Sequence, residues 1–180
     1  MRIALSGTHR TGKSTLLEEL ARLLPDYALV EEPYHLLAEE GYVFSQPPSL
    51  EDFEAQLERS LEELEREEEK VLFDRCPLDF LAYLAVHEDA NHFSLDRWLP
   101  QVRDAIENLD LVVLVPIEVP DRIALVSADD DGPDREAVDG ELREMLLDDS
   151  FELETEVLEV TGTVEERARA VLGAIHGGAR

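Results

Sequence analysis

The chain has 180 residues, with 43 acidic and 16 basic side chains and a formal net charge of −27. This length predicts a single domain with a core of its own. So negative a surface repels phosphate groups and argues against nucleic acid as a partner, and no apolar run is long enough to predict a membrane span. Cys76 is the only cysteine, and no signal peptide precedes the first apolar run, so a reducing cytoplasm is the expected location.

Apolar and polar segments alternate in the way typical of a parallel sheet covered by helices on both faces. Strands are predicted at 2–6, 27–31, 71–74, 111–116 and 155–161. Helices are predicted at 13–24, 49–69, 78–88, 95–108, 138–148 and 164–175. Ser49 and Thr163 are expected N-caps, because an acid follows each of them three residues later. The sequence thus indicates one α/β domain over residues 1–176, followed by a flexible tail at 177–180.

A phosphate-binding motif follows the first predicted strand. The segment Gly7–Ser14 fits G-x-x-x-x-G-K-[ST], in which glycines let the backbone N–H groups point at one phosphate group. Lys13 is then expected to reach the β- and γ-phosphates, and the Ser14 hydroxyl to take a place on Mg²⁺. The helix that begins at Lys13 adds the positive end of its dipole. The residues expected to bind the nucleotide are Gly7, Thr8, His9, Arg10, Thr11, Gly12, Lys13, Ser14 and Thr15.

Two further polar pairs stand where predicted strands end. Asp74 closes the third strand beside the motif and can hold Mg²⁺, while Arg75 is suited to phosphate oxygens or an acceptor hydroxyl. Glu32, before Pro33 at the end of the second strand, can accept the proton of an attacking hydroxyl. The alternatives are a structural Asp74–Arg75 pair and an ordinary surface acid at Glu32.

Together with a late arginine-bearing loop, these motifs resemble the nucleoside and nucleotide kinase group of P-loop enzymes. Its members include deoxynucleoside kinases, thymidylate kinases and small ATP-binding proteins related to ribosylnicotinamide kinase. The resemblance implies a three-layer P-loop fold whose five parallel strands have the order 2-3-1-4-5. It also implies that Arg10 touches the γ-phosphate during transfer, as in one class of thymidylate kinases.

Two departures from those thymidylate kinases bear on the acceptor. His9 stands where they have an aspartate, and Glu31 stands where they carry an arginine for the acceptor's phosphate. Both departures disfavour a nucleoside monophosphate. An unphosphorylated, hydroxyl-rich or cationic small molecule, such as a nucleoside-like one, fits the Glu31–Glu32 pair better.

The segment 121–143 corresponds in position to the lid of such kinases, and Arg122, Arg135 and Arg143 are its cations. Arg135 is the strongest candidate for reaching the phosphates on closure. Arg143 has an alternative as the partner of Glu141 or Glu144 on its own helix.

Three other segments are weaker indicators. The helix at 49–69 has an apolar stripe that Gln56 interrupts; deoxynucleoside kinases read the base with a phenylalanine and a glutamine, so Gln56 is either a substrate contact or a partly exposed side chain. By the same resemblance, the backbone of 161–163 lies against the adenine. Tyr83 and Trp98 are interpreted as core residues, and Cys76 as a packed side chain rather than a nucleophile.

The sequence therefore predicts a kinase that uses Mg²⁺ and ATP to phosphorylate a hydroxyl of a small molecule. The predicted catalytic residues are Lys13, Arg10, Glu32, Asp74, Arg75 and Arg135, with Ser14 and Asp74 on the metal ion. The alternative is a P-loop NTPase or nucleotide-binding protein that regulates a protein partner. A homodimer through the leucine-striped helix is also considered.

Overall fold

The computed structural model describes residues 1–119, 134–148, 151 and 153–177. Within these residues, five strands form a parallel sheet in the order β2-β3-β1-β4-β5. The strands are β1 Arg2–Ser6, β2 Ala28–Val30, β3 Val71–Asp74, β4 Leu111–Leu114 and β5 Glu156–Glu159. The predicted fold class and strand order are confirmed, and the strand ends differ from the prediction by at most two residues.

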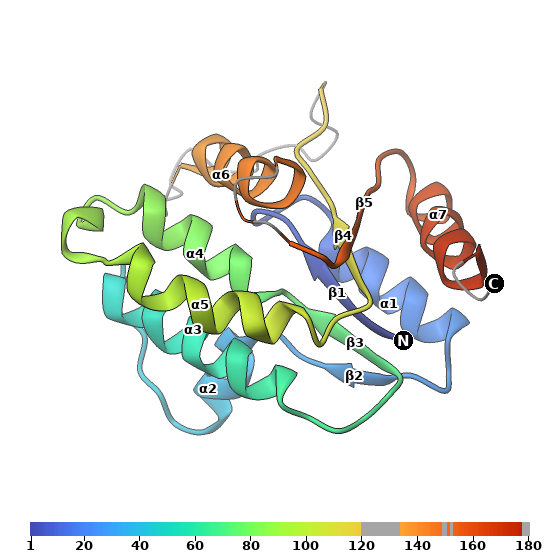
Figure 1. Cartoon of the computed structure of the whole chain (residues 1–180), viewed down its shortest axis with the longest axis horizontal. Helices are drawn as coiled ribbons and strands as arrows, with labels where there is room; N and C mark the ends of the chain where they lie inside the picture. Colours follow the sequence, from blue (N-terminus) through green and yellow to red (C-terminus); the bar gives the residue numbers. More distant parts are fainter. Residues whose placement is uncertain (120–133, 149–150, 152, 178–180) are drawn as a thin grey trace.

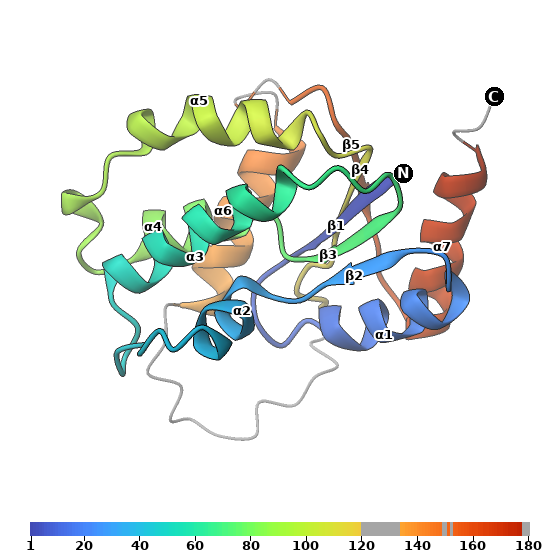
Figure 2. The same cartoon turned by 90° about the horizontal axis from the view of Figure 1, so that it is seen from below.

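Helices cover both faces of the sheet (Figures 1 and 2). Helices α1 (Lys13–Leu23) and α7 (Val164–Gly177) lie on one face. The other face carries α3 (Leu50–Leu64), α4 (Pro77–Val86), α5 (Leu95–Ile106) and α6 (Arg135–Leu147). Helix α2 (Pro33–Glu39) directly follows the short edge strand β2, and a 3₁₀ turn spans Ala90–His92.

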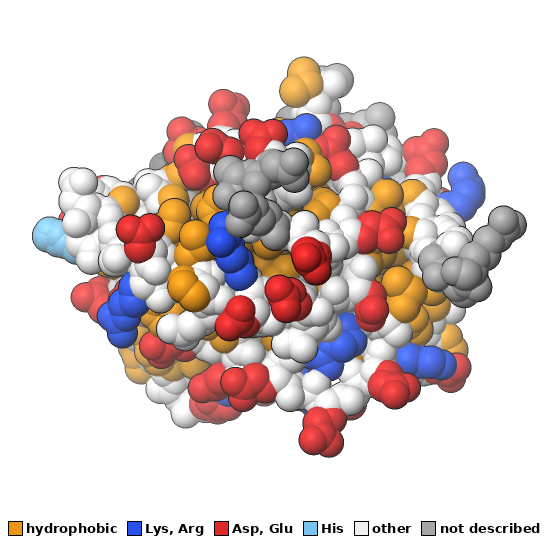
Figure 3. Space-filling view, in the orientation of Figure 1, with side chains coloured by type: hydrophobic (Ala, Val, Ile, Leu, Met, Phe, Trp, Pro, Cys, Tyr) orange, Lys and Arg blue, Asp and Glu red, His pale blue; other side chains and the backbone are white. Residues whose placement is uncertain are grey.

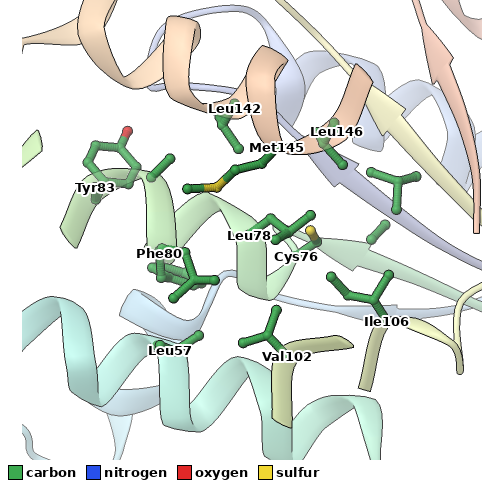
Figure 4. Packing of buried hydrophobic residues seen from close by; sticks show 14 of the residues in the cluster. Leu57, Cys76, Leu78, Phe80, Tyr83, Val102, Ile106, Leu142, Met145 and Leu146 are labelled. Atoms are coloured by element: carbon green, nitrogen blue, oxygen red, sulfur yellow. The ribbon is translucent and has the colours of Figure 1, made fainter. Parts of the chain in front are cut away.

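The two faces bury separate apolar clusters because side chains alternate along each strand. In β1, Ile3 and Leu5 belong to the cluster beneath α1 and α7, whereas Ala4 belongs to the cluster beneath α3–α6. Figure 4 shows the latter, in which Leu57, Leu78 and Met145 from three helices meet. The buried members of the predicted apolar stripe of α3 also belong to this cluster, so these side chains pack within the chain.

Helix α3 ends at Leu64, five residues before the predicted end. The side chain of Arg2 supplies a physical reason, since its guanidinium donates to the carbonyl oxygens of Leu64 (2.7 Å), Arg66 (2.5 Å) and Glu68 (2.9 Å). These bonds satisfy main-chain acceptors beyond the last turn. Near the end of α3, Glu63 is buried and pairs with Arg59 and Arg66.

The prediction also missed one helix and the first turn of another. Helix α2 lies outside the predicted set; it begins at Pro33, whose fixed φ and missing N–H suit a first helical position. Helix α6 begins at Arg135 rather than at 138, because the Asp134 side chain accepts from the amides of Glu136 and Ala137. The last nine residues of the expected lid are thus helical, and its remainder up to residue 133 lies outside the described residues.

The register of the central strands places the motifs at one edge of the sheet. Leu5 of β1 pairs with Asp74 of β3, and Ser6 pairs with Leu114 of β4. The phosphate-binding segment therefore leaves the sheet next to Asp74. At the surface, Figure 3 shows acidic side chains spread over the visible face, with basic ones scattered among them. Of the described helices, none has the length and hydropathy needed to cross a membrane.

Replacing Leu57 by Ala should lower the free energy of unfolding by about 2–5 kcal/mol, because Leu57 is fully buried and its neighbours cannot all close the cavity. Urea denaturation measures the change. Leu147→Ala, at a helical leucine that is 45% exposed, is the matched control and should have a much smaller effect. Equal losses in the two variants would contradict the assigned core.

Candidate active site

The phosphate-binding segment, or P-loop, runs from Gly7 to Ser14 and joins β1 to α1. Gly7 has φ +146°, and a Cβ there would lie 2.3 Å from the carbonyl oxygen of Val115. Gly12 has φ +88° and is the N-cap of α1. Glycine is therefore required at both motif positions, once for space and once for backbone conformation. Arg10 also lies in the left-handed region, with φ +56°, which is uncommon for a residue with a side chain.

Each carbonyl group of the loop from Gly7 to Thr11 accepts a hydrogen bond from a cationic side chain. Arg75 donates to Gly7 (2.9 Å) and Lys13 to Thr8 (2.6 Å). Arg135 donates to both His9 and Arg10 (2.9 Å each), and Arg167 to Thr11 (2.8 Å). With these carbonyls bound, the first amide groups of α1, which have no intrahelical partner, supply the positive end of a site for an anion.

Lys13 is buried, although it is one of the residues predicted to bind phosphate. Burial, followed by the positive charge of Arg75, lowers the pKa of its ammonium group to about 7. A phosphate group beside it would favour the charged form. An anionic ligand beside Lys13 would therefore raise this pKa.

Asp74 has the features of a ligand for a divalent cation. Among the described residues, its Oδ1 atom is buried without a hydrogen-bond partner. Burial and the negative charge of Glu32 raise the pKa of Asp74 to about 6. The described residues contain no group of three or more His, Cys, Asp or Glu side chains suited to a metal ion. A single carboxylate with the exposed Ser14 hydroxyl nevertheless fits Mg²⁺, which takes few protein ligands and keeps water and phosphate oxygens.

Glu32, Arg75 and Asp79 form a chain of charges beside the P-loop. Arg75 donates through Nε to Glu32 (2.5 Å) and through a terminal nitrogen to Asp79 (3.2 Å). Asp79 is fully buried and also accepts from the amides of Gly7 and Cys76 (3.0 Å each). Burial alone would raise the pKa of Glu32, but the charge and hydrogen bond of Arg75 outweigh it and lower that pKa. Glu32 is therefore ionised at neutral pH and has a fixed position.

A cavity of about 360 Å³ opens next to this chain of charges. Its lining combines polar groups of the P-loop region with aromatic side chains, namely His9, Arg10, Glu32, Tyr34, Pro48, Phe53, Gln56, Arg75, Phe80 and Tyr83. The volume lies in the range of small-molecule sites. We call it the acceptor cavity. It shares His9 and Arg10 with the P-loop, so a molecule inside it would be next to a bound phosphate.

Tyr83 connects the acceptor cavity to the P-loop, a role that the prediction of a core residue missed. Its ring is buried and stacks on Phe53 with centroids 5.1 Å apart. Its hydroxyl accepts from the amide of His9 (3.0 Å). Gln56, also buried, donates to the carbonyl oxygen of Asp52 (3.0 Å). Because a carbonyl only accepts, this bond identifies the amide nitrogen and leaves the Gln56 oxygen for another donor.

The other predicted side chains lie in different surroundings. Arg143 pairs with Glu159 of β5 (2.6 Å) rather than with Glu141 or Glu144, and Arg122 lies outside the described residues. Cys76 is fully buried, and burial raises the pKa of its thiol, as expected for a packed side chain. A second cavity, of about 330 Å³, includes Gly162 in its lining.

Sequence reasoning missed Asp79 and Arg167 as well as Tyr83. Asp79 had a local signal, since it stands three residues after Cys76 at the start of α4 and completes a capping box there. Arg167 had none, because its contacts with the P-loop lie 156 residues away in the chain.

Fold and site together define a P-loop α/β domain. The family model AAA_28, described as an AAA domain, matches residues 2–167. The chain belongs to this family. Comparison with curated protein sequences gives no match.

Several solved structures share the fold at low sequence identity. Deoxyadenosine kinase from M. mycoides with bound dATP is 18% identical, with a TM-score of 0.67 over 98% of this chain and 100% of that one. Shikimate kinase from Aquifex aeolicus is 18% identical, with a TM-score of 0.57 over 99% and 98%. The NadR protein in complex with NAD and AMP-PNP is 19% identical, with a TM-score of 0.67 over 99% of this chain but 49% of that one.

Replacing Asp74 by Asn should raise the free energy of unfolding of the metal-free protein at neutral pH. The pKa of about 6 lies above the 3.8 of an ordinary aspartate, so ionisation of Asp74 costs stability as the pH rises from about 4 to about 6. Asparagine removes this cost, which is on the order of 1–2 kcal/mol after solvent screening.

Urea denaturation in a chelator at about pH 4.5 and about pH 7.5 measures the difference, which should be larger at the higher pH. The exposed Asp104 offers a control, Asp104→Asn. If Asp74→Asn gave no stabilisation at either pH, or the same stabilisation at both, the account of Asp74 would be contradicted.

Proposed function

We propose that the protein is a kinase that transfers the γ-phosphoryl group of a nucleoside triphosphate to a hydroxyl of a small molecule in the acceptor cavity. The observation that supports this most is the ionised Glu32, which Arg75 holds in the wall of a cavity that adjoins the P-loop. A nucleotide site alone would not need an adjoining cavity like the acceptor cavity, with a fixed carboxylate in its wall.

Glu32 is the proposed base. As the acceptor oxygen bonds to the γ-phosphorus, the bond from that phosphorus to the bridging oxygen breaks, and the hydroxyl proton goes to Glu32. Arg75 fixes the carboxylate in place and is proposed to contribute positive charge near the transferred group. Charge neutralisation at the phosphates is assigned to Lys13, Arg10 and Arg135.

Ser14 and Asp74 are the residues that would hold Mg²⁺. Bound there with the triphosphate, the ion would neutralise the charge that develops on the phosphate oxygens. The Oδ1 atom of Asp74, buried without a partner among the described residues, supports this assignment. The donor's base is proposed to lie in the second cavity, beside Gly162.

The acceptor is proposed to be nucleoside-like and unphosphorylated. Phe53 and Tyr83 present stacked rings to the acceptor cavity, and Gln56 contributes an amide oxygen; such a lining suits a planar group with a hydrogen-bond donor. Two of the structural neighbours support this choice of acceptor: one is a deoxyadenosine kinase, and the other is the NadR protein in complex with NR. The negative charge of Glu32 in the lining disfavours a phosphorylated acceptor, whereas Glu31 is exposed and lies outside the lining.

The test is ADP release from ATP and Mg²⁺ with deoxynucleosides, ribonucleosides and non-nucleoside polyols as acceptors. Release should require an acceptor and should be lost in Lys13→Ala, whose circular dichroism should match the wild type. ADP release that is independent of any acceptor would indicate an NTPase. Tight ATP binding without turnover would indicate a nucleotide-binding protein that regulates a partner, and either result would overturn the kinase proposal.

Replacing Glu32 by Gln should lower kcat by about 10²–10⁴-fold, because the amide cannot accept the hydroxyl proton. ATP affinity should change by less than about threefold, since the proposed role is at the acceptor. Steady-state kinetics and equilibrium ATP binding measure the two quantities. Glu39→Gln, at an exposed acid on α2, is the control. A fall in ATP affinity as large as the fall in kcat would show that Glu32 is not the base.

A further inference from the structure

Arg167 on α7 joins three segments that are far apart in the sequence. The side chain is 8% exposed. One terminal nitrogen donates to the carbonyl oxygen of Thr11 in the P-loop (2.8 Å), and the other donates to Glu118 after β4 (3.0 Å). The same oxygen of Glu118 accepts from the amide of Gly162 after β5 (2.5 Å). The P-loop and the loop at Gly162 are thus connected through one buried ion pair.

The loop at Gly162 is fixed from two sides. Gly162 has φ +97°, and a Cβ there would lie 2.5 Å from the Glu166 carboxylate. Thr163 and Glu166 bond to each other's amides (2.8 and 3.3 Å) and cap α7. Because α7 begins at this loop and carries Arg167 in its first turn, a displacement of the loop would also move Arg167.

Glu118 and Gly162 also line the cavity of about 330 Å³, with Arg143 and Glu159 in the same lining. This is the cavity assigned above to the base of the donor nucleotide. Arg167 itself is not part of the lining. Within the described part of the chain, its side chain bonds to Glu118 on the cavity side and to the backbone of Thr11 on the phosphate side.

We propose that Arg167 is a positioning residue that fixes the second cavity and the P-loop relative to each other, so that one nucleotide can bind to both. The inference rests on the proposed function, since it requires a nucleoside triphosphate at the P-loop. Arginine is suited to this role because its planar guanidinium directs two N–H groups at two acceptors in fixed geometry. A lysine at the same position keeps the charge, but a single ammonium cannot reproduce that fork.

The experiment compares equilibrium binding of Mg²⁺-ATP with that of Mg²⁺-tripolyphosphate, which has the phosphates but no base. The ratio of the two dissociation constants measures how much the nucleoside part of ATP contributes to binding. In Arg167→Lys the preference for ATP should fall about tenfold, the effect of one lost charge-assisted hydrogen bond. Glu118→Gln should also lower the preference, with tripolyphosphate affinity changed by less than about twofold.

Arg169→Lys is the matched control, since Arg169 is exposed two residues further along α7, and it should leave both affinities unchanged. The double variant Arg167→Lys with Glu118→Gln should lose no more preference than the more affected single variant, because the two side chains act as one unit. Thermal unfolding of each ligand-free variant checks that the chain is folded. If Arg167→Lys is unfolded, Glu118→Gln alone tests the proposal.

An unchanged ratio in the folded variants, or equal losses for ATP and tripolyphosphate, would overturn the positioning role. Additive losses in the double variant would overturn it as well. A wild-type protein that binds neither ligand would instead contradict the proposed function, so the two failures are distinguishable.

Discussion

The orientation of the P-loop backbone is the constraint on which the rest of the site depends. Its carbonyl groups from Gly7 to Thr11 bond to Lys13 and to three arginines, one directly after β3 and the others on α6 and α7. A chain with net charge −27 has 16 basic side chains, and four of them act on this one loop. At short range, these cations and the oriented amides of the loop oppose the negative field of the whole surface.

The same loop stands between two cavities. On one side, Tyr83 bonds to the amide of His9 and forms part of the acceptor cavity. On the other side, Arg167 bonds to the carbonyl oxygen of Thr11 and leads through Glu118 to the second cavity. Backbone strain is concentrated here too, since Arg10 and Arg75 both have left-handed conformations. Two cavities held in fixed positions beside one loop are what the proposed in-line transfer between two molecules would require.

The sequence predicted features that depend on nearby residues better than features that depend on contacts between residues far apart in the chain. Strand order, the N-caps Ser49 and Thr163, and the P-loop follow from local patterns together with the family resemblance, and the structure bears them out. The end of α3 did not follow, because it depends on Arg2, more than 60 residues away. The partner of Arg143 and the contacts of Tyr83 and Arg167 depend in the same way on which strands and helices become neighbours in the folded chain.

The acceptor cavity bears on the choice between a kinase and an NTPase. A hydrolase must orient a water molecule, which needs several polar partners close together. The acceptor cavity has polar groups at His9, Arg10, Glu32, Gln56 and Arg75, and the rings of Tyr34, Phe53, Phe80 and Tyr83 form the apolar part of its wall. Water bound to the polar groups would leave the rings without a partner, whereas a molecule with an apolar body and one hydroxyl would contact the rings and present that hydroxyl to Glu32. The aromatic part of the lining thus supports the proposal of an organic acceptor.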